Sequence, residues 1–552
     1  MSAVLPSAST TLRKVGDLVL GANTMRRRGL FDPLRPDHAV RSVVAIGKYG
    51  PFAGVVVHSA QTRPNSPAIV DERGELTFGE LDRQSNALAR ALNAQGVGEG
   101  DVIAVLARDH RGLVLTLLAT GKLGVRAVLM NTGFAKPQFA DVVAREKVKA
   151  LLHDSEFTEL TSAIPESVPR ILTWSDESDG ADPSVPTLDS LMAGQSTDAV
   201  KLPAKPGGMV ILTSGTTGTP KGAPRDKVSP FISAQLVDRI PVPRDGTILM
   251  AAPIFHATGL SQFTIGLALG NRIVFQQRRF DPEQTLANIE KFGAGELVVV
   301  PTMLQRMLDL PAEILGKYDM SSLNVIFAAG SAIPPDVVTR ALDYFGDSLY
   351  NVYGSTECAV ITVATPPELR HAPNTAGKSP VGIRIALYDD QRKRITAPNV
   401  TGTIFIDNPH SFKAYTDGRT KETVDGMMSS GDVGHFDEHG LLFIDGRDDD
   451  MIVSGGENVF PQEVEHLIAD RSDVQEAAVI GVDDHQFGKR LRAFVVPGPE
   501  SKRDGQEIKD YVKANLARYK VPREVIFLDE LPRNATGKLL RKPLSEIEVP
   551  GE

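Results

Sequence analysis

The chain has 552 residues, of which 41% are hydrophobic, and its 60 basic and 69 acidic side chains give a formal net charge of −9. That length exceeds what one hydrophobic core supports, so we expect at least two domains, and the acidic balance argues against general nucleic-acid binding. The single cysteine, Cys358, excludes an internal disulfide and a cysteine-rich zinc site, and it fits a reducing cytoplasm. No apolar run predicts a membrane-spanning helix, and the N-terminus lacks the layout of a secretory signal.

The first segment with a clear pattern runs from Leu12 to Leu30. Its apolar residues recur at helical spacing, and Arg26–Arg28 lie near its end. One interpretation is a helix that rests on an anionic membrane surface. The other is a helix docked on the protein's own surface, which Asp17 favours because it interrupts the basic pattern. We assign residues 1–54 to an N-terminal extension that contains this amphipathic helix.

Strand and helix patterns alternate from about Val55 onward. Val102–Leu106 and Ala127–Met130 are short apolar runs that predict buried strands, and the mostly apolar Leu113–Leu123 predicts a helix between them. This alternation is typical of parallel βαβ units.

A loop rich in glycine and hydroxyl groups, Thr213–Gly222, follows the apolar run Met209–Leu212. Its glycines let backbone N–H groups turn inward into an anion-attracting nest, and Lys221 adds a positive charge. A polyphosphate is the ligand that suits such a loop. The common P-loop pattern does not fit, because Pro220 precedes the lysine and Gly222 follows it. A flexible linker is the alternative, which the preceding strand and the Pro-Lys-Gly ending argue against.

A second group of motifs carries nucleotide-like chemistry. Tyr353–Glu357 offers an aromatic face for a base, a hydroxyl for phosphate and a carboxylate for Mg²⁺. Ala328–Gly330 are small residues at a strand end, which suits either the approach of a flat ligand or close helix packing. Asp432 follows a predicted glycine turn, where it either caps the turn or accepts ribose hydroxyls. His256 lies between an apolar run and a glycine. It is either a polar residue whose hydrogen bonds are satisfied within the protein or a residue that faces a ligand.

The C-terminal part of the chain begins with a charged segment. Arg447 precedes three successive aspartates, which predict a solvated hinge or a charged turn. Ser454–Glu457 is a glycine-rich stretch that can approach a narrow ligand closely. Gly537 immediately precedes Lys538 near the chain end; by itself this pattern indicates a solvated lysine.

Taken in this order, the motifs resemble those of the adenylate-forming superfamily of acyl-CoA synthetases, luciferases and peptide-synthetase adenylation domains, over roughly residues 55–541. The resemblance implies an α/β fold, with a large N-terminal domain (55–445) of βαβ-built mixed sheets plus a small β-barrel. A small mobile α+β domain (446–552) follows, with its hinge at Asp449. Two departures are Ala223-Pro224-Arg225, where many members carry an aliphatic residue and then a histidine, and Ala414, where glycine is usual.

The resemblance also implies the roles of individual residues. It gives catalytic roles to Thr213, His256, Glu357 and Lys538, with Glu357 holding Mg²⁺ and Asp449 acting as the hinge. It assigns ATP contacts to Thr213, Ser214, Gly215, Thr216, Thr217, Gly218, Lys221, Gly330, Ser331, Ala332, Tyr353, Gly354, Thr356, Asp432, Arg447 and Lys538. It assigns the CoA channel to Ser454, Gly455, Gly456 and Glu457.

The implied activity is that of an ATP-dependent acid–thiol ligase, with ATP, Mg²⁺ and coenzyme A taking part. The general pattern and the apolar N-terminal helix are closest to bacterial medium- or long-chain fatty acid–CoA ligases. A coumarate-like aryl acid is the alternative substrate. Loading of a carrier protein, and an inactive nucleotide- or acyl-binding protein, are alternatives of another class. We expect a cytoplasmic protein that binds no nucleic acid. Peripheral membrane contact through residues 12–30 and formation of a homodimer are both left open.

Overall fold

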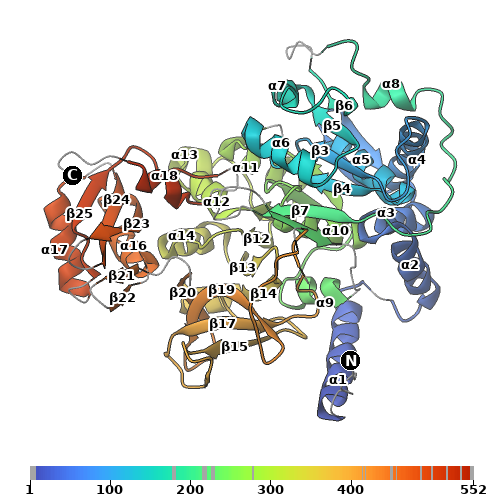
Figure 1. Ribbon diagram of the computed structural model, residues 1–552. Helices are drawn as coiled ribbons and strands as arrows, with labels where there is room; N and C mark the ends of the chain where they lie inside the picture. The colour runs from blue at the N-terminus through green and yellow to red at the C-terminus, as the bar shows by residue number, and fades with distance from the viewer. Residues whose placement is uncertain are drawn as a thin grey trace.

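A computed structural model shows a large body with a smaller C-terminal lobe at one side (Figure 1). The structure describes residues 8–30, 32–176, 182–213, 221–225, 231–276, 279–412, 414–416, 418–447, 452–454, 457–459, 461–484, 488–498, 501–516, 520–534 and 538–547. Within these ranges, no helix combines the length and the apolar character that crossing a bilayer requires.

The N-terminal extension forms three helices where the sequence predicted one. They are α1 (Ala8–Arg27), α2 (Pro36–Tyr49) and α3 (Pro51–Thr62). Pro36 and Pro51 stand in the first turn of α2 and α3, where the missing N–H removes no hydrogen bond. These prolines are the signal in the sequence that could have predicted both helices. Gly50 joins the two helices with φ +83°, a conformation that favours glycine. The predicted boundary after residue 54 falls inside α3.

The largest sheet of the body has the strand order β14-β13-β12-β11-β9-β10-β1-β2. Its central pairs are parallel, whereas β1–β2 and β13–β14 are antiparallel. The strands are β1 (Pro67–Asp71), β2 (Gly74–Thr77), β9 (Thr247–Met250), β10 (Arg272–Phe275), β11 (Glu296–Val299), β12 (Val325–Ala329), β13 (Leu349–Ser355) and β14 (Ala359–Ala364). The helices from this part of the chain are α9 (Phe231–Asp238), α10 (Ala257–Ala268), α11 (Pro282–Phe292), α12 (Pro301–Leu308), α13 (Ala312–Leu315), α14 (Pro335–Phe345) and α15 (Pro366–His371).

A second sheet of the body has the order β6-β5-β3-β4-β7-β8 and is parallel except for β7–β8. Its strands are β3 (Val102–Leu106), β4 (Arg126–Leu129), β5 (Ala150–Asp154), β6 (Arg170–Trp174), β7 (Met209–Thr213) and β8 (Lys221–Arg225). The helices around it are α4 (Phe78–Ala94), α5 (Arg111–Leu123), α6 (Lys136–Arg145), α7 (Thr158–Thr161), which follows a 3₁₀ turn at Ser155–Phe157, and α8 (Leu188–Met192). The predicted parallel βαβ units are confirmed. The two sheets share one core, because Ile248 of the first and Leu129 of the second belong to the same buried cluster.

A third, antiparallel sheet lies below the body in Figure 1 and forms the small β unit of the large domain. Its strand order is β16-β15-β17-β19-β18, with β20 paired to β19. The strands are β15 (Arg384–Tyr388), β16 (Arg394–Ile395), β17 (Gly402–Asp407), β18 (Thr423–Val424), β19 (Met427–Phe436) and β20 (Leu442–Arg447).

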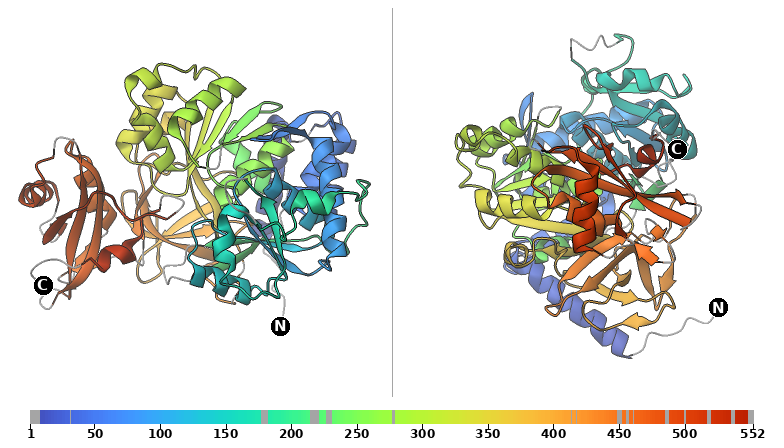
Figure 2. Two further views of the ribbon diagram at one scale, coloured as in Figure 1. Left: turned by 90° about the horizontal axis from the view of Figure 1, so that it is seen from above. Right: turned by 90° about the vertical axis from the view of Figure 1, so that its left-hand side faces the viewer.

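The C-terminal lobe is a small α+β unit that lies at one side of the body, as Figure 1 and the left view of Figure 2 show from two perpendicular directions. Its elements are β21 (Ile452–Ser454), β22 (Glu457–Val459), α16 (Pro461–Ala469), β23 (Val474–Asp484), β24 (Gly488–Pro497), α17 (Gly505–Asn515), β25 (Glu524–Phe527) and α18 (Arg541–Ser545). The sheet has the order β22-β21-β24-β23 with β25 beside β24, and α16 packs on it through Val464. A large α/β domain followed by a small α+β one is the predicted fold class, which is confirmed.

Candidate active site

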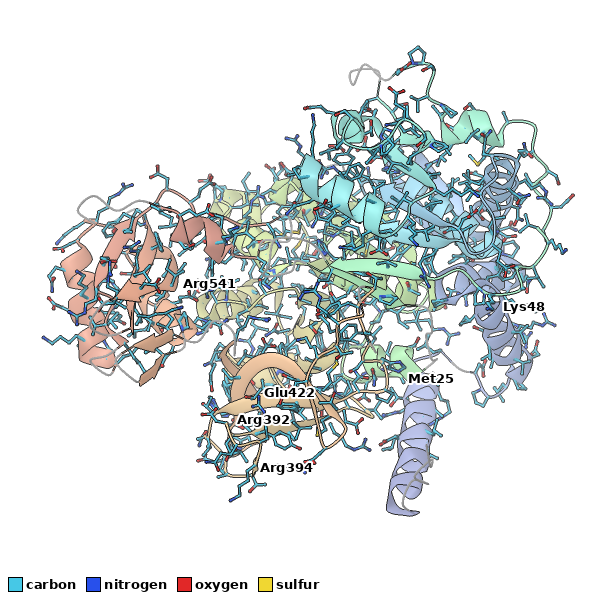
Figure 3. The ribbon with its side chains drawn as sticks, in the orientation of Figure 1. Met25, Lys48, Arg392, Arg394, Glu422 and Arg541 are labelled. Carbon is cyan, nitrogen blue, oxygen red and sulfur yellow. The ribbon has the colours of Figure 1, made fainter. Side chains whose placement is uncertain are left out.

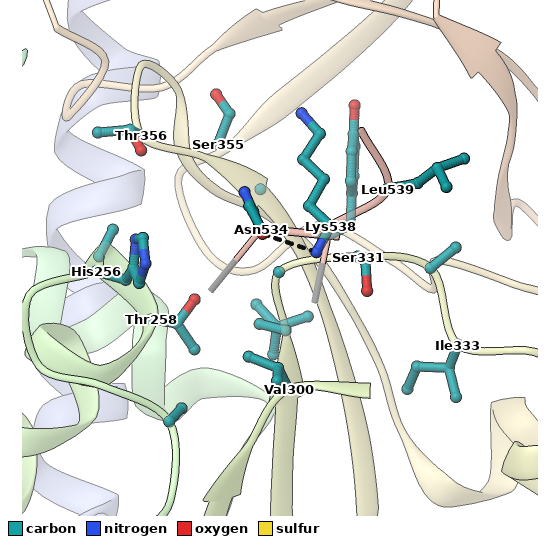
Figure 4. Close-up of a pocket in the computed structure, with 18 of the residues that line it drawn as sticks. His256, Thr258, Val300, Ser331, Ile333, Ser355, Thr356, Asn534, Lys538 and Leu539 are labelled. Carbon is teal, nitrogen blue, oxygen red and sulfur yellow. Dashed lines mark hydrogen bonds between the residues drawn. The ribbon is translucent and has the colours of Figure 1, made fainter. Parts of the chain in front are cut away.

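One cavity of about 1930 Å³ lies where the body meets the C-terminal lobe, and residues of both line it (Figure 4). It lies beyond the carboxyl ends of the parallel strands β11, β12 and β13, the usual place for a ligand in an open α/β sheet. The structure brings the following predicted site residues together in its lining: Lys221, His256, Gly330, Ser331, Ala332, Tyr353, Gly354, Thr356, Glu357, Asp432, Arg447 and Lys538.

Other predicted site residues have no described place in this lining. Thr213 ends β7, and Ser454 and Glu457 are register partners in the β21–β22 hairpin. Outside the described residues lie Ser214, Gly215, Thr216, Thr217, Gly218, Asp449, Gly455 and Gly456. The roles predicted for these residues, and for the C-terminal hinge, therefore stay predictions.

The strand end at β12 opens the cavity towards the backbone. Gly330 follows β12 with φ +110°, in the region that favours glycine. A Cβ there would meet only Val300 Cγ1, at 3.6 Å, so the backbone conformation rather than crowding requires glycine. Ser331 and Ala332 follow and line the cavity. This arrangement leaves room beside the chain for a flat group, and the role predicted for these small residues stays a prediction.

Tyr353 and Asp432 form a buried pair within the lining. The Tyr353 hydroxyl donates to Asp432 Oδ2 at 2.5 Å, and Arg447 Nη1 lies 3.5 Å from Asp432 Oδ1. Burial raises the pKa of the Asp432 carboxyl, although the Tyr353 hydrogen bond and the charges of Arg447, Lys421 and Lys538 oppose this. Both the Arg447 charge and the Lys538 charge therefore act on the Asp432 carboxylate. Arg447 ends β20 of the body, whereas Lys538 belongs to the C-terminal lobe.

The predicted glycine turn before Asp432 is wrong. Residues 429–432 lie inside strand β19, and Gly431 has φ +85° where the sequence suggested a turn. Asp432 pairs in register with Arg447 of β20, and the register shifts between Val433 and Gly434. Gly431, with its left-handed backbone conformation, thus lies in a paired strand next to a shift in register. Strand pairing holds the Asp432 backbone more firmly than a free turn would.

Glu357 lies beside a tyrosine to which the sequence analysis gave no role. Tyr415 donates its hydroxyl to Glu357 Oε1 at 2.6 Å, and the Phe412 N–H donates to the Glu357 carbonyl at 2.7 Å. Burial opposes ionisation of the Glu357 carboxyl, but the Tyr415 hydrogen bond and the Lys421 charge outweigh it and lower its pKa. Lys221 Nζ lies 5.1 Å from the centre of the Tyr415 ring, within the range of a cation–π contact.

This carboxylate fits a metal that is shared with phosphate oxygens. Glu357 is ionised, and its Oε1 accepts a hydrogen bond from Tyr415. Mg²⁺ is commonly bound through one or two carboxylates plus the phosphates of a substrate, and not by an all-protein cage. In the described part of the chain, no three His, Cys, Asp or Glu side chains gather as such a cage.

His256 stands at the N-cap of α10, with its ring beside that of Phe255. Its Nε2 is buried and has no hydrogen-bond partner among the described residues. The segment before it is held by Asp109, whose two carboxylate oxygens both lie 3.1 Å from the Ile254 N–H. Burial lowers the pKa of His256 to about 4, so the imidazole is neutral at pH 7. A neutral imidazole can bind a ligand by hydrogen bonding and not by charge.

The neutral state of His256 has a testable pH dependence. Its folded pKa of about 4 lies below the ordinary value, so the unfolded chain takes up this proton first and the stability that the neutral ring contributes is lost as pH falls from about 6.5 towards 4. We expect the His256 ring resonances in an NMR titration to keep their neutral position from pH 8 down to about 5. Comparison with His256→Gln assigns the signal. A midpoint near 6.5 for this ring would contradict the prediction.

The lysine loop of the C-terminal lobe reaches the cavity. Two hydrogen bonds join Asn534 to Lys538. The Asn534 Oδ1 accepts from the Lys538 N–H at 2.9 Å, the contact dashed in Figure 4, and the Asn534 N–H donates to the Lys538 carbonyl at 2.9 Å. Arg533 anchors the loop to β23 through Glu476, 2.6 Å away. Lys538 and Asn534 thus line the cavity together with Ser331 and Thr356 (Figure 4).

Comparisons with known proteins agree with this geometry. Indoleacetate–CoA ligase of Aromatoleum aromaticum is 30% identical over 498 residues, covering 88% of this chain and 96% of that protein. Feruloyl-CoA synthase of an Amycolatopsis species is 32% identical over 492 residues, with the same coverage of 88% and 96%. The solved structure of o-succinylbenzoate CoA synthetase from Bacillus subtilis, in complex with its acyl-adenylate intermediate, has a TM-score of 0.77 at 28% identity and covers 90% of this chain and 98% of that one.

Two family models account for most of the chain. The C-terminal domain of AMP-binding enzymes matches residues 463–538, which include the lysine loop. The model of the AMP-binding enzyme itself matches residues 56–416, which include Tyr353–Glu357 and His256. On this match, together with relatives that it covers almost end to end, the chain belongs to the AMP-binding enzyme family.

Proposed function

We propose that this chain is an AMP-forming carboxylic acid–CoA ligase that acts on an apolar acid. The observation that carries this is the cavity in which Glu357 and Asp432 of the body face Lys538 of the C-terminal lobe. Enzymes of this family use ATP, Mg²⁺ and CoA, and the carboxylate, the basic groups and the strand-end backbone described above suit those partners.

The first half-reaction joins the acid to AMP. A carboxylate oxygen attacks the α-phosphorus, the bond from that phosphorus to the bridging oxygen breaks, and pyrophosphate leaves with the electron pair. Lys538 stabilises the negative charge that grows on the reacting oxygens, because a fixed cation in a water-poor site costs no reorganisation. Mg²⁺, when bound at Glu357, neutralises phosphate charge. Asp432 accepts ribose hydroxyls, and His256 orients the acid carboxylate through a neutral hydrogen bond.

The second half-reaction passes the acyl group to sulfur. The CoA thiolate attacks the acyl carbonyl carbon, and AMP leaves with the electrons of the C–O bond. We place Ser454–Glu457 beside the entering thiol after the C-terminal lobe has turned about Asp449, which withdraws Lys538. A hinge of this kind needs a few backbone angles to change.

Substitution of the hinge residue separates the two half-reactions. Proline holds φ near about −65°, so Asp449→Pro should slow thioester formation more than adenylation. Pyrophosphate release in single turnover reports the first step, and thioester formed from supplied acyl-AMP and CoA reports the second. The control is Asp449→Ala, which removes the same carboxylate without fixing φ. Thioester formation at the wild-type rate in Asp449→Pro would remove the hinge from the mechanism.

The names of the relatives favour the aryl alternative over the fatty acid prediction for the acid itself. Indoleacetate, ferulate and o-succinylbenzoate are all aromatic acids. We therefore propose an aryl or arylalkyl acid as the first candidate. A fatty acid is the second candidate, because the cavity continues away from His256 along an apolar helix face that reaches Ala268.

Pyrophosphate release across a panel of acids, with and without CoA, tests the proposal. We expect AMP, pyrophosphate and an acyl-CoA with at least one aryl or fatty acid. If the acyl group is transferred to a carrier protein and not to CoA, the carrier protein replaces CoA as the acceptor in this proposal. A folded sample that turns over no ATP with any acid would leave a nucleotide- or acyl-binding protein in place of a ligase.

We also propose that α1 and α2 contact an anionic membrane surface. α1 packs on α9, Thr24 donates to Asp238 at 3.2 Å, and Asp17 pairs with Arg384 at 2.5 Å. The predicted docking on the protein's own surface therefore describes one side of α1. The other side leaves Leu18 and Val19 more than half exposed.

The same region carries exposed basic side chains on a chain whose net charge is −9, which favours lipid headgroups of negative charge. Arg26 and Arg27 end α1, and Lys48 is labelled near the end of α2 in Figure 3. We expect co-sedimentation with vesicles that contain phosphatidylglycerol, weakened by Val19→Asp and unchanged by Leu202→Asp, an exposed position elsewhere. Equal recovery with purely zwitterionic vesicles, or no recovery at all, would contradict this.

A further inference from the structure

One face of α10 lines the cavity along the whole helix. The lining residues at its start and along that face are His256, Ala257, Leu260, Ser261, Thr264, Ile265 and Ala268. They recur at the three- and four-residue spacing of a single helical face. With about 1.5 Å of rise per residue, this face leads about 18 Å away from His256. At about 1.5 Å per C–C bond, that length holds at least about 12 carbon atoms of an extended chain.

Thr258, near His256 at the start of α10, also lines the cavity. Beyond it the face of α10 is apolar in effect, although it includes two further hydroxyls. Ser261 Oγ donates to the Thr258 carbonyl and Thr264 Oγ1 to the Leu260 carbonyl, both at 2.8 Å. These bonds lie within the helix, so neither hydroxyl needs a polar ligand. Other apolar lining residues come from neighbouring elements: Met209 and Ile211 of β7, Leu236 of α9, and Ile46, Pro51 and Val55 of the α2–α3 hairpin.

The α2–α3 hairpin is packed tightly enough to act as a fixed wall. Gly54 of α3 touches α2 so closely that a Cβ would lie 2.5 Å from Ile46 Cα. The Phe52 and Phe263 rings join α3 to α10, with centroids 5.2 Å apart. At the other end of the two helices, Arg63 reaches Gly270. These two contacts place α3 alongside α10, and Val55 of α3 lines the same cavity as Ile46 and the α10 face.

We infer that Ile46 and Val55 set the length of the apolar tail that this enzyme accepts. The inference rests on the proposed ligase function and names a wall of the acid site. Both residues precede residue 56, where the match to the family model begins. The wall is thus built by α2 and the first turns of α3, ahead of the residues that the family model matches. The acid it selects has an apolar tail that extends past a single ring bound beside His256.

Filling the wall position tests the inference. Ile46→Trp should lower kcat/KM for hexadecanoate at least about 10-fold, because a pocket discriminates by about that factor for a single methylene. With butanoate the change should stay within about 2-fold, since that acid ends before the wall. The matched control is Val44→Trp on the opposite face of α2, which is 45% exposed and outside the cavity lining. The readout is pyrophosphate release across straight-chain acids from butanoate to hexadecanoate.

A second variant covers the case in which tryptophan disrupts folding. Ile46→Ala widens the same position and should shift the preference towards longer acids, the opposite direction, which unfolding cannot produce. Identical chain-length profiles in wild type, Ile46→Trp and Ile46→Ala would overturn the inference while leaving the ligase intact. An equal loss on every acid in both variants would also overturn it. Turnover of an aryl acid but of no straight-chain acid by the wild type would overturn this inference and leave the ligase function standing. Absence of turnover with every acid, aryl acids included, would remove the proposed function itself.

Discussion

Lys538→Ala should lower the adenylation rate by about 100-fold or more, while thioester formation from supplied acyl-AMP continues. The reason is position: the Lys538 charge acts on Asp432 in the same cavity that Glu357 lines, and one preorganised donor at the reacting oxygens is worth about 100-fold or more in rate. We expect the second step to continue without this lysine, because the rotation of the lobe that we propose would withdraw it.

Two separate measurements distinguish these steps. Pyrophosphate release in a single turnover reports adenylation, and acyl-CoA formed from synthetic acyl-AMP reports thioester formation. Lys513→Ala, an exposed lysine on α17 of the same lobe, is the control for a general loss of charge or stability. If both half-reactions of Lys538→Ala slow equally, the lysine serves the fold of the lobe and not the adenylation chemistry.

Glu357→Gln should lower adenylation at cellular Mg²⁺ by at least about 100-fold, because the metal contributes several kcal/mol of charge stabilisation that a neutral amide cannot retain. Tyr415→Phe removes only the hydrogen bond to Glu357 Oε1. It should raise the Mg²⁺ concentration for half-maximal rate about 10-fold to 100-fold, the usual effect of losing a group that orients a metal ligand. At saturating Mg²⁺ its kcat should approach that of the wild type.

A matched control is available for the tyrosine. Tyr344 on α14 also donates one hydrogen bond, to the Leu315 carbonyl at 2.6 Å, and lies outside the cavity lining. Tyr344→Phe should leave the Mg²⁺ dependence unchanged. A fall in kcat of Tyr415→Phe that no Mg²⁺ concentration restores would show that Tyr415 acts on the fold or on the nucleotide, and not through Glu357.

Much of the candidate site was predictable because its motifs are local. Tyr353–Glu357 lies at a strand end, and the run Val102–Leu106 is strand β3 from its first residue to its last. Short apolar runs, glycines and charged side chains at fixed spacing carry their own physical constraints, since a buried strand and a strand-end ligand loop differ in composition. Lys538 was assigned to the nucleotide site by the family resemblance, because its local pattern alone indicates a solvated lysine.

Contacts between distant segments were not predictable in this way. Tyr415 is 58 residues from Glu357, and Asp432 is 79 residues from Tyr353. Ser429–Asp432 has the composition of a turn but lies in β19, because pairing with β17 and β20 satisfies its backbone. No local propensity encodes which strands pair, and tertiary context overrides it.

By itself, the sequence determined the chemistry: an acidic two-domain chain with glycine, hydroxyl, carboxylate and lysine motifs in the order of an enzyme that forms acyl-AMP. Only the tertiary structure decided which groups meet and which elements surround the cavity. Residues of α2, α3, β7, α9 and α10 line it, and their apolar composition suits burial in a core equally well. Since an apolar side chain looks the same in sequence whether it faces the core or a ligand, the packing of these elements had to be seen before a substrate tail could be placed among them.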